Sequence, residues 1–125
     1  MGKKAKISQL KSFYVAFCGI WAVFLNERNF RFHTLAALIA IGCCWFFHVE
    51  KHEWITVLIL IALVLCAETI NTAIEYICDL ISPQYSPYVK TIKDIAAGSV
   101  LLAAIFSIII GCIIFIPHII SVICK

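Results

Sequence analysis

Long apolar stretches separated by short polar clusters dominate the hydrophobic pattern of this chain. Residues 32–49 and 95–124 carry no formal charge, and another apolar stretch starts at Trp54. A helix needs about 20 mostly apolar residues to cross the hydrocarbon core of a bilayer. The helical pattern that starts at Trp54 continues past its first acidic residue, so this helix carries polar groups in one half. We expect transmembrane helices at about residues 32–49, 54–81 and 95–117.

Short polar segments separate these helices. Residues 50–53 are charged and predict a turn between the first two spans. Pro83 and Pro87 break the helical pattern after the second span and predict a loop over residues 82–94. Pro117 predicts the end of the third span, because proline cannot donate a backbone hydrogen bond.

The N-terminal segment differs because polar side chains gather at its start. In residues 7–26, Gln9 and Lys11 precede a run of aromatic and aliphatic residues. This arrangement is typical of an amphipathic helix that lies in the membrane interface. We therefore expect an all-α integral membrane protein with three transmembrane helices and an N-terminal amphipathic interfacial helix. Residues 1–125 would form a single domain.

The composition argues against a soluble domain. The 125 residues are 63% hydrophobic and 14% charged, whereas soluble domains average about 25% charged residues. A soluble fold of this size could not bury so much apolar surface. Nothing suggests a nucleic-acid partner, and none is expected.

The placement of charge predicts the orientation in the membrane. The four lysines that precede the first acidic residue, Glu27, are Lys3, Lys4, Lys6 and Lys11. Lys90 and Lys93 lie in the second expected loop, whereas residues 50–53 are net negative. Because basic residues favour the cytoplasmic side, we expect a multi-pass protein with a cytoplasmic N-terminus.

The second span carries an acidic stripe. With Glu68 set at zero, Asn71 falls at about −60°, Glu75 at about −20° and Asp79 at about +20° around the helix. A carboxylate inside the membrane costs on the order of 2.5 kcal/mol or more. A divalent cation, basic side chains or bound protons must compensate it. The stripe alone leaves open a hydrogen-bonded structural cluster and a proton or cation pathway.

Charged residues outside the second span favour phosphoryl transfer. Two carboxylates from different helices, Glu27 and Glu75, can hold Mg²⁺, which prefers oxygen ligands and bridges phosphates. Lys93 can neutralise phosphate charge, and Glu68 can accept a proton from a lipid hydroxyl. Acid, metal and lysine are the parts that phosphoryl transfer requires. No Walker-type loop is present, which excludes the corresponding soluble nucleotide fold.

Four stretches then carry a resemblance that covers nearly the whole chain. In order and spacing the sequence resembles the small prokaryotic diacylglycerol kinase family of integral membrane lipid kinases. The E-x-x-N-[ST]-A-I-E element followed by K-D is highly specific in a chain of this size. The matching stretches are Glu27-Arg28-Asn29-Phe30-Arg31-Phe32-His33, Glu68-Thr69-Ile70-Asn71-Thr72-Ala73-Ile74-Glu75, Asp79-Leu80-Ile81 and Lys93-Asp94-Ile95-Ala96-Ala97-Gly98.

The resemblance implies a role for each matching residue. Glu68 would contact the lipid alcohol and act as catalytic base. Glu27 and Glu75 would bind the Mg²⁺ of Mg·ATP. The remaining expected site residues are Lys93 and Asp94 as contacts to ATP, and Asn71 and Asp79 as supporting residues.

The departures from the family pattern point to one branch. The diacylglycerol-specific branch carries an acid where this chain has His33, and a histidine where it has Ser86. The stretch from Glu27-Arg28-Asn29 to His33 and the N-T-A-I-E sequence resemble the undecaprenol kinase branch. The resemblance implies a homotrimer with shared active sites in a bacterial inner membrane, with ATP and Mg²⁺ required. Diacylglycerol kinase is the alternative, and a small proton- or cation-translocating protein is a more distant one.

Overall fold

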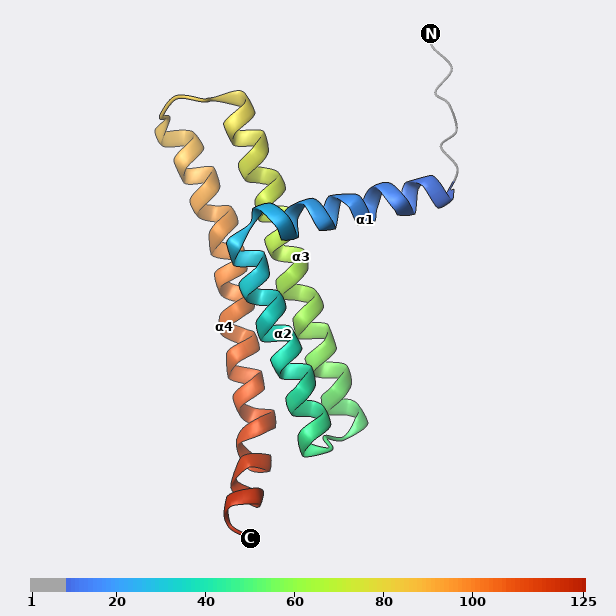
Figure 1. The fold of residues 1–125 in the computed structure, drawn as a ribbon. Coiled ribbons are helices and arrows are strands. Elements are labelled where there is room, and N and C mark those ends of the chain that lie inside the picture. The colour runs from blue at the N-terminus through green and yellow to red at the C-terminus, as the bar shows by residue number, and fades with distance from the viewer. Residues whose placement is uncertain (1–8) are drawn as a thin grey trace.

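Four α-helices make up the fold (Figure 1). The computed structural model describes residues 9–125, so the first two residues of the expected interfacial helix 7–26, and Lys3, Lys4 and Lys6, lie outside the described residues. No strand occurs in residues 9–125, which confirms the all-α fold class. The helices are α1 (Gln9–Asn26), α2 (Arg28–Phe47), α3 (Lys51–Ile81) and α4 (Pro87–Ile123).

The helices α2, α3 and α4 run side by side, and α1 leaves this bundle crosswise (Figure 1). The contact between α3 and α4 is the most extensive of the structure. We call the end near residues 48–50 the turn end and the end near residues 82–86 the loop end. At the loop end, α3 and α4 extend beyond the level at which α1 departs. Each of α2, α3 and α4 is long and apolar enough to span a membrane, which confirms the three expected spans.

The extent of α4 corrects two sequence-based expectations. Helix α4 begins at Pro87, so residues 87–94 of the expected 82–94 loop are helical. Proline suits the first turn of a helix, where its missing N–H would have had no partner. The helix also continues past Pro117 to Ile123. Pro117 removes a single backbone donor, and neighbouring groups in a membrane helix can compensate for such a loss.

Local capping explains the tight turn between α2 and α3. His48 adopts a left-handed conformation (φ 52°), and its N–H bonds the last carbonyls of α2, as is common where helices end. Glu50 and Glu53 then form a capping box at the start of α3, in which the Glu50 N–H donates to Glu53 Oε2 at 2.8 Å. This box satisfies backbone donors that the first turn would otherwise leave unpaired.

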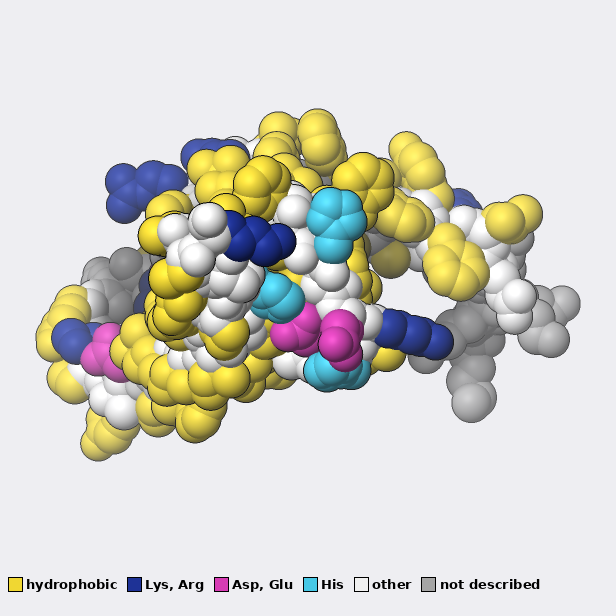
Figure 2. All heavy atoms as spheres, turned by 90° about the horizontal axis from the view of Figure 1, so that it is seen from below, with side chains coloured by type: hydrophobic (Ala, Val, Ile, Leu, Met, Phe, Trp, Pro, Cys, Tyr) yellow, Lys and Arg dark blue, Asp and Glu magenta, His cyan; other side chains and the backbone are white. Residues whose placement is uncertain are grey.

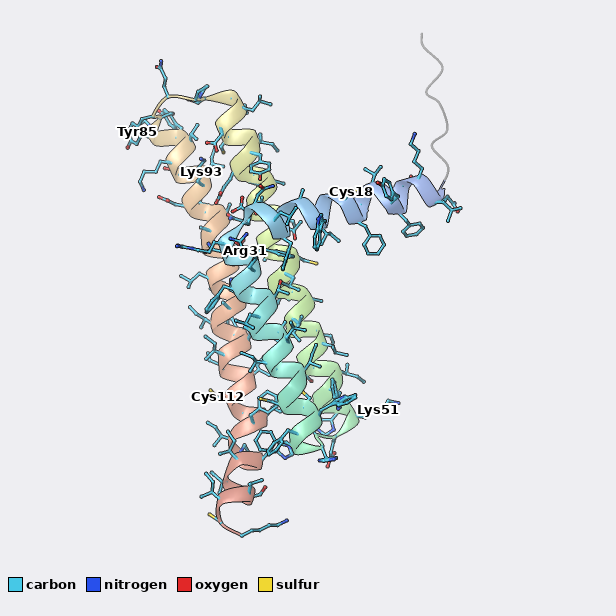
Figure 3. All side chains as sticks on the ribbon, viewed as in Figure 1. Cys18, Arg31, Lys51, Tyr85, Lys93 and Cys112 are labelled. Carbon is cyan, nitrogen blue, oxygen red and sulfur yellow. The ribbon has the colours of Figure 1, made fainter. Side chains whose placement is uncertain are left out.

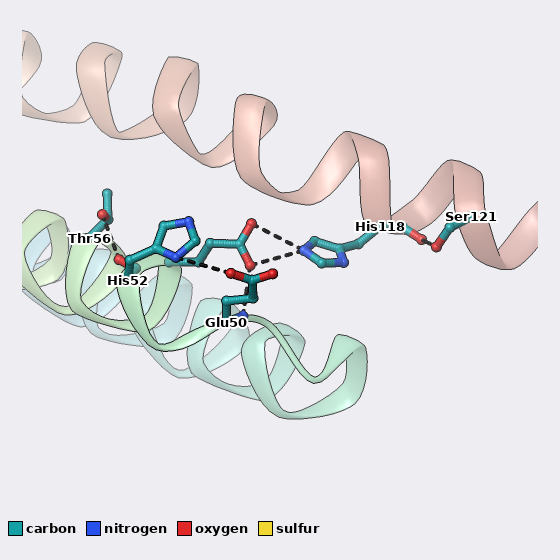
Figure 4. Close-up of polar contacts among 6 residues, drawn as sticks. Glu50, His52, Thr56, His118 and Ser121 are labelled. Carbon is teal, nitrogen blue, oxygen red and sulfur yellow. Dashed lines mark hydrogen bonds and ion pairs between the residues drawn. The ribbon is translucent and has the colours of Figure 1, made fainter.

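A small apolar core and a polar pair hold the turn end together. Cys44, Val57 and Ile114 are buried against one another, one from each spanning helix. Seen from this end, acidic and histidine side chains gather on the surface (Figure 2). Nε2 of His118 lies 3.2 and 3.1 Å from Oε1 and Oε2 of Glu53 (Figure 4). This pair joins the start of α3 to the last turns of α4.

Candidate active site at the junction of α1, α2 and α3

The break between α1 and α2 places Glu27 beside the bundle. Glu27 is the N-cap residue of α2 and has an extended backbone. Nη1 of Arg31 donates to the carbonyls of Leu25 at 2.7 Å and Phe24 at 3.2 Å, the last turn of α1 (Figure 3). A cation at this position also complements the negative end of the helix dipole. Arg31 therefore connects the two helices on either side of Glu27.

The central part of α3 buries polar side chains rather than apolar ones. The exposed fractions of Glu68 and Thr72 are 2%, and that of Asn71 is 7%. Buried polar groups are costly unless they are satisfied, and a cluster of them on one face is unusual for a spanning helix. The acidic stripe predicted from the sequence is therefore partly an interior surface of the bundle.

Two expected site residues and one histidine lie in the neighbourhood of Glu68. Glu75, Glu27 and His33 all lie near enough for electrostatic interaction with its carboxylate. They come from α3, from the α1–α2 junction and from α2. Glu68 thus lies within electrostatic range of two further carboxylates and a histidine, which come from three parts of the chain.

Asn71 organises one side of this site. Its Nδ2 donates to Oε1 of Glu75 at 3.0 Å, one turn further along α3. Its own Oδ1 is buried and has no hydrogen-bond partner among the described residues, and the same holds for the hydroxyl of Thr72. Unsatisfied buried polar atoms are rare in folded proteins and call for an explanation. Here they fit a site that receives a ligand or a partner group.

The oxygen donors at this site fit Mg²⁺ only together with another ligand. Among residues 9–125 there is no cluster of three or more His, Cys, Asp or Glu residues that could hold a metal ion by itself. Mg²⁺ is commonly bound by one or two carboxylates together with substrate phosphates. Glu75, whose carboxylate is oriented by Asn71, and Glu27 match this kind of binding site.

Lys93 approaches the site from α4. Its Nζ bonds Oδ1 of Asp79 at 2.5 Å, which joins α4 to the last turns of α3 (Figure 3). Glu75 is also close enough to interact with the charge of Lys93. The expected supporting residue Asp79 thus contacts the expected phosphate-binding lysine directly.

Asp94 is the one expected site residue whose observed contact lies elsewhere. Its carboxylate accepts a 2.5 Å hydrogen bond from Lys90 on the same helix, and both side chains are more than half exposed. In a single chain, Asp94 is therefore paired with an exposed neighbour rather than with the Glu68 group.

Three residues of this region were not among the candidates predicted from the sequence. They are Thr72, His33 and Arg31. The helical period could have placed Thr72 beside the acidic stripe, because it follows Asn71 directly in the sequence. His33 and Arg31 could be placed only once the course of the chain between α1 and α2 was known.

Comparison with known proteins agrees with this geometry. The model of the prokaryotic diacylglycerol kinase family matches residues 14–115. The chain belongs to this family. It is therefore a lipid kinase and a membrane protein, and membership implies a lipid substrate and ATP as phosphate donor.

Individual relatives carry two different names. The chain is 42% identical to the undecaprenol kinase of Bacillus subtilis over 107 residues, which cover 86% of this chain and 87% of the relative. It is 36% identical to a diacylglycerol kinase of Synechocystis over 113 residues, or 90% of this chain and 65% of the relative. It is 30% identical to the diacylglycerol kinase of Escherichia coli K12 over 100 residues, or 80% and 82% of the two chains.

Proposed function

We propose that this lipid kinase transfers the γ-phosphate of ATP to undecaprenol and so forms undecaprenyl phosphate. The observation that carries the proposal is the burial of Glu68 within electrostatic range of Glu75, Glu27 and His33. The choice of lipid is supported by the 42% identity to an undecaprenol kinase, against 36% and 30% to diacylglycerol kinases.

In the proposed mechanism, Glu68 acts as general base. Its carboxylate accepts the proton of the lipid hydroxyl while the hydroxyl oxygen forms a bond to the γ-phosphorus. The bond from the γ-phosphorus to the bridging oxygen breaks, and ADP leaves with that oxygen. A positioned base contributes about 10²–10⁴-fold to such a proton transfer. Because Glu68 lies in a helix that is long and apolar enough to span a membrane, it suits an acceptor that is carried in the membrane.

The remaining charged residues would bind the nucleotide. Glu27 and Glu75 would hold Mg²⁺, which neutralises phosphate charge when bound. Lys93 would exchange its bond to Asp79 for a phosphate oxygen, since a flexible ammonium group serves as a mobile point charge. Asp79 would support Lys93, Asn71 would orient Glu75, and Asp94 would contact ATP.

We further propose that the loop end faces the cytoplasm of a bacterium, where ATP is available, and that the protein lies in the inner membrane. Arg28, Arg31, Lys90 and Lys93 lie toward this end, in agreement with the bias of basic residues to the cytoplasmic side. The N-terminus would then also be cytoplasmic. The sites would be shared between copies in a homotrimer. Support for sharing comes from Asp94, whose contact in a single chain lies away from Glu68.

The test is phosphate transfer from labelled ATP by the purified protein in lipid micelles, with undecaprenol and diacylglycerol offered separately. We expect labelled undecaprenyl phosphate and little labelled phosphatidic acid. Glu68→Gln should abolish transfer, whereas Glu50→Gln, an exposed acid at the turn end, should leave it unchanged. Faster transfer to diacylglycerol would overturn the choice of lipid. Full activity of Glu68→Gln would overturn the role of the base.

A further inference from the structure

A groove in the spanning bundle starts next to the proposed active site. It is a cavity of about 280 Å³ between α2, α3 and α4. Leu65 lines it one turn before Glu68 on α3, and His33 lines it from α2. On α4 the lining extends from Ala104 to Phe115, which corresponds to about 16 Å along the helix axis.

The lining of the groove is apolar and made largely of small residues. Ala36, Ala40, Ala104 and Gly111 leave space where larger side chains would fill it. The hydroxyl of Ser107 already donates to the carbonyl of Ala103 at 2.8 Å, so it needs no partner from a ligand. An apolar cavity of this kind takes up hydrocarbon rather than water.

The far end of the groove is closed by contacts between its walls. Phe47 of α2 and Phe115 of α4 have ring centroids 6.3 Å apart. Cys44, Val57 and Ile114 pack together at the same level. A helix with its side chains is about 10 Å across, so a helix of a second copy could not continue through this end. A single hydrocarbon chain is thinner and fits a blind groove.

We propose that this groove receives the isoprenoid chain of the acceptor and thereby places its hydroxyl at Glu68. The inference rests on the proposed function and adds a chain-binding site to it. The alanines and Gly111 leave room for the methyl branches that distinguish an isoprenoid chain from a straight acyl chain. Because lipid tails already surround the bundle, the chain gains close packing and orientation rather than burial from water. Orientation of the acceptor lowers the barrier to transfer.

The test is a substitution on α4 whose larger side chain fills the far end of the groove. A Cβ added at Gly111 would meet no atom within 4 Å, so Gly111→Leu should fold. Gly42→Leu is the matched control, since Gly42 has the same open surroundings but does not line the groove. With undecaprenol as acceptor, we expect Gly111→Leu to lower kcat/KM by about tenfold. With prenol, whose single isoprene unit reaches only the near end of the groove, both variants should behave like the unchanged protein.

A second measurement does not depend on catalysis. A farnesol analogue with a diazirine on its chain should label segments 57–65 and 104–115 on irradiation, and Gly111→Leu should shift the label toward Leu65. Labelling confined to α1 would overturn the proposal, even if the protein phosphorylates undecaprenol. Equal kcat/KM of Gly111→Leu and Gly42→Leu with undecaprenol would also overturn it. Loss of oligomeric state in Gly111→Leu without altered labelling would instead identify the groove as a contact between copies. Chain labelling of the groove without any kinase activity would leave the binding site in place and refute the proposed reaction.

Discussion

The side chains of Asn71 and Glu75 form a hydrogen bond of 3.0 Å within one turn of α3. Asn71 is 7% exposed, and its carbonyl oxygen has no partner among the described residues. The amide therefore has one fixed end, which holds Glu75, and one free end. A side chain bonded in this way suits a residue that orients a metal-binding carboxylate next to a ligand.

Asn71→Ala removes this orienting bond and leaves Glu75 in place. We expect the Mg²⁺ concentration for half-maximal activity to rise by about 10–100-fold, as is usual when a group that orients a metal ligand is lost. Measuring kinase activity over a range of Mg²⁺ concentrations gives this half-maximal concentration. Thr69→Val serves as control, because the Thr69 hydroxyl bonds only the carbonyl of Leu65 in its own helix. An unchanged Mg²⁺ requirement in Asn71→Ala would contradict the orienting role.

Substitutions of the three carboxylates should affect different quantities, either kcat or the binding of Mg·ATP. Glu68→Gln should lower kcat by at least about 10²-fold, because it removes the base, while binding of Mg·ATP persists. Glu27→Ala and Glu75→Ala should weaken binding of Mg·ATP. A fluorescent ATP analogue, titrated in the presence of Mg²⁺, separates the two effects. If all three variants lost nucleotide affinity equally, this division of roles would be wrong.

The bond between Lys93 and Asp79 predicts that substitutions at the two positions raise the KM for ATP to different extents. Lys93→Met should raise the KM for ATP by about tenfold or more, because a charge-assisted contact to phosphate is lost. Asp79→Asn should raise it less, because the lysine keeps its charge and loses only its partner. Steady-state kinetics with varied ATP measures both. Lys51→Met, a change in an exposed lysine at the turn end, should have no effect. A larger effect of Asp79→Asn than of Lys93→Met would indicate that Asp79 contacts the nucleotide itself.

The pair of Glu53 and His118 predicts a contribution to stability that is separate from catalysis. Its side chains are 18% and 26% exposed and join α3 to α4. Glu53→Gln and His118→Ala should each lower the Tm, and the double variant should lose less than the sum, because both remove the same contact. Thermal unfolding in detergent measures this coupling. The kcat of the folded variants should stay unchanged. Additive losses would show that the two residues act independently.

The limits of sequence-based prediction are clear at particular residues. The presence of three spans was predicted correctly because two long uncharged runs have few alternatives to a membrane helix, and because the helical pattern of the middle span continues past Glu68. The start of α4 at Pro87 and its passage through Pro117 were predicted wrongly. Proline marks helix ends in water, but its cost depends on position and on neighbouring groups, which the sequence does not show.

By itself the sequence determined that this protein is helical, lies in a membrane, and carries Glu68, Asn71, Glu75 and Asp79 on one side of a helix. These properties follow from local periodicity, since residues three or four apart share a helix face. Only the tertiary structure decided that His33 lies within electrostatic range of Glu68, that Lys93 bonds Asp79, and that a groove starts next to Glu68. Such contacts depend on how separate helices pack and on the angle at which α1 leaves α2. Packing geometry depends on the whole set of facing side chains, so no short segment of sequence specifies it.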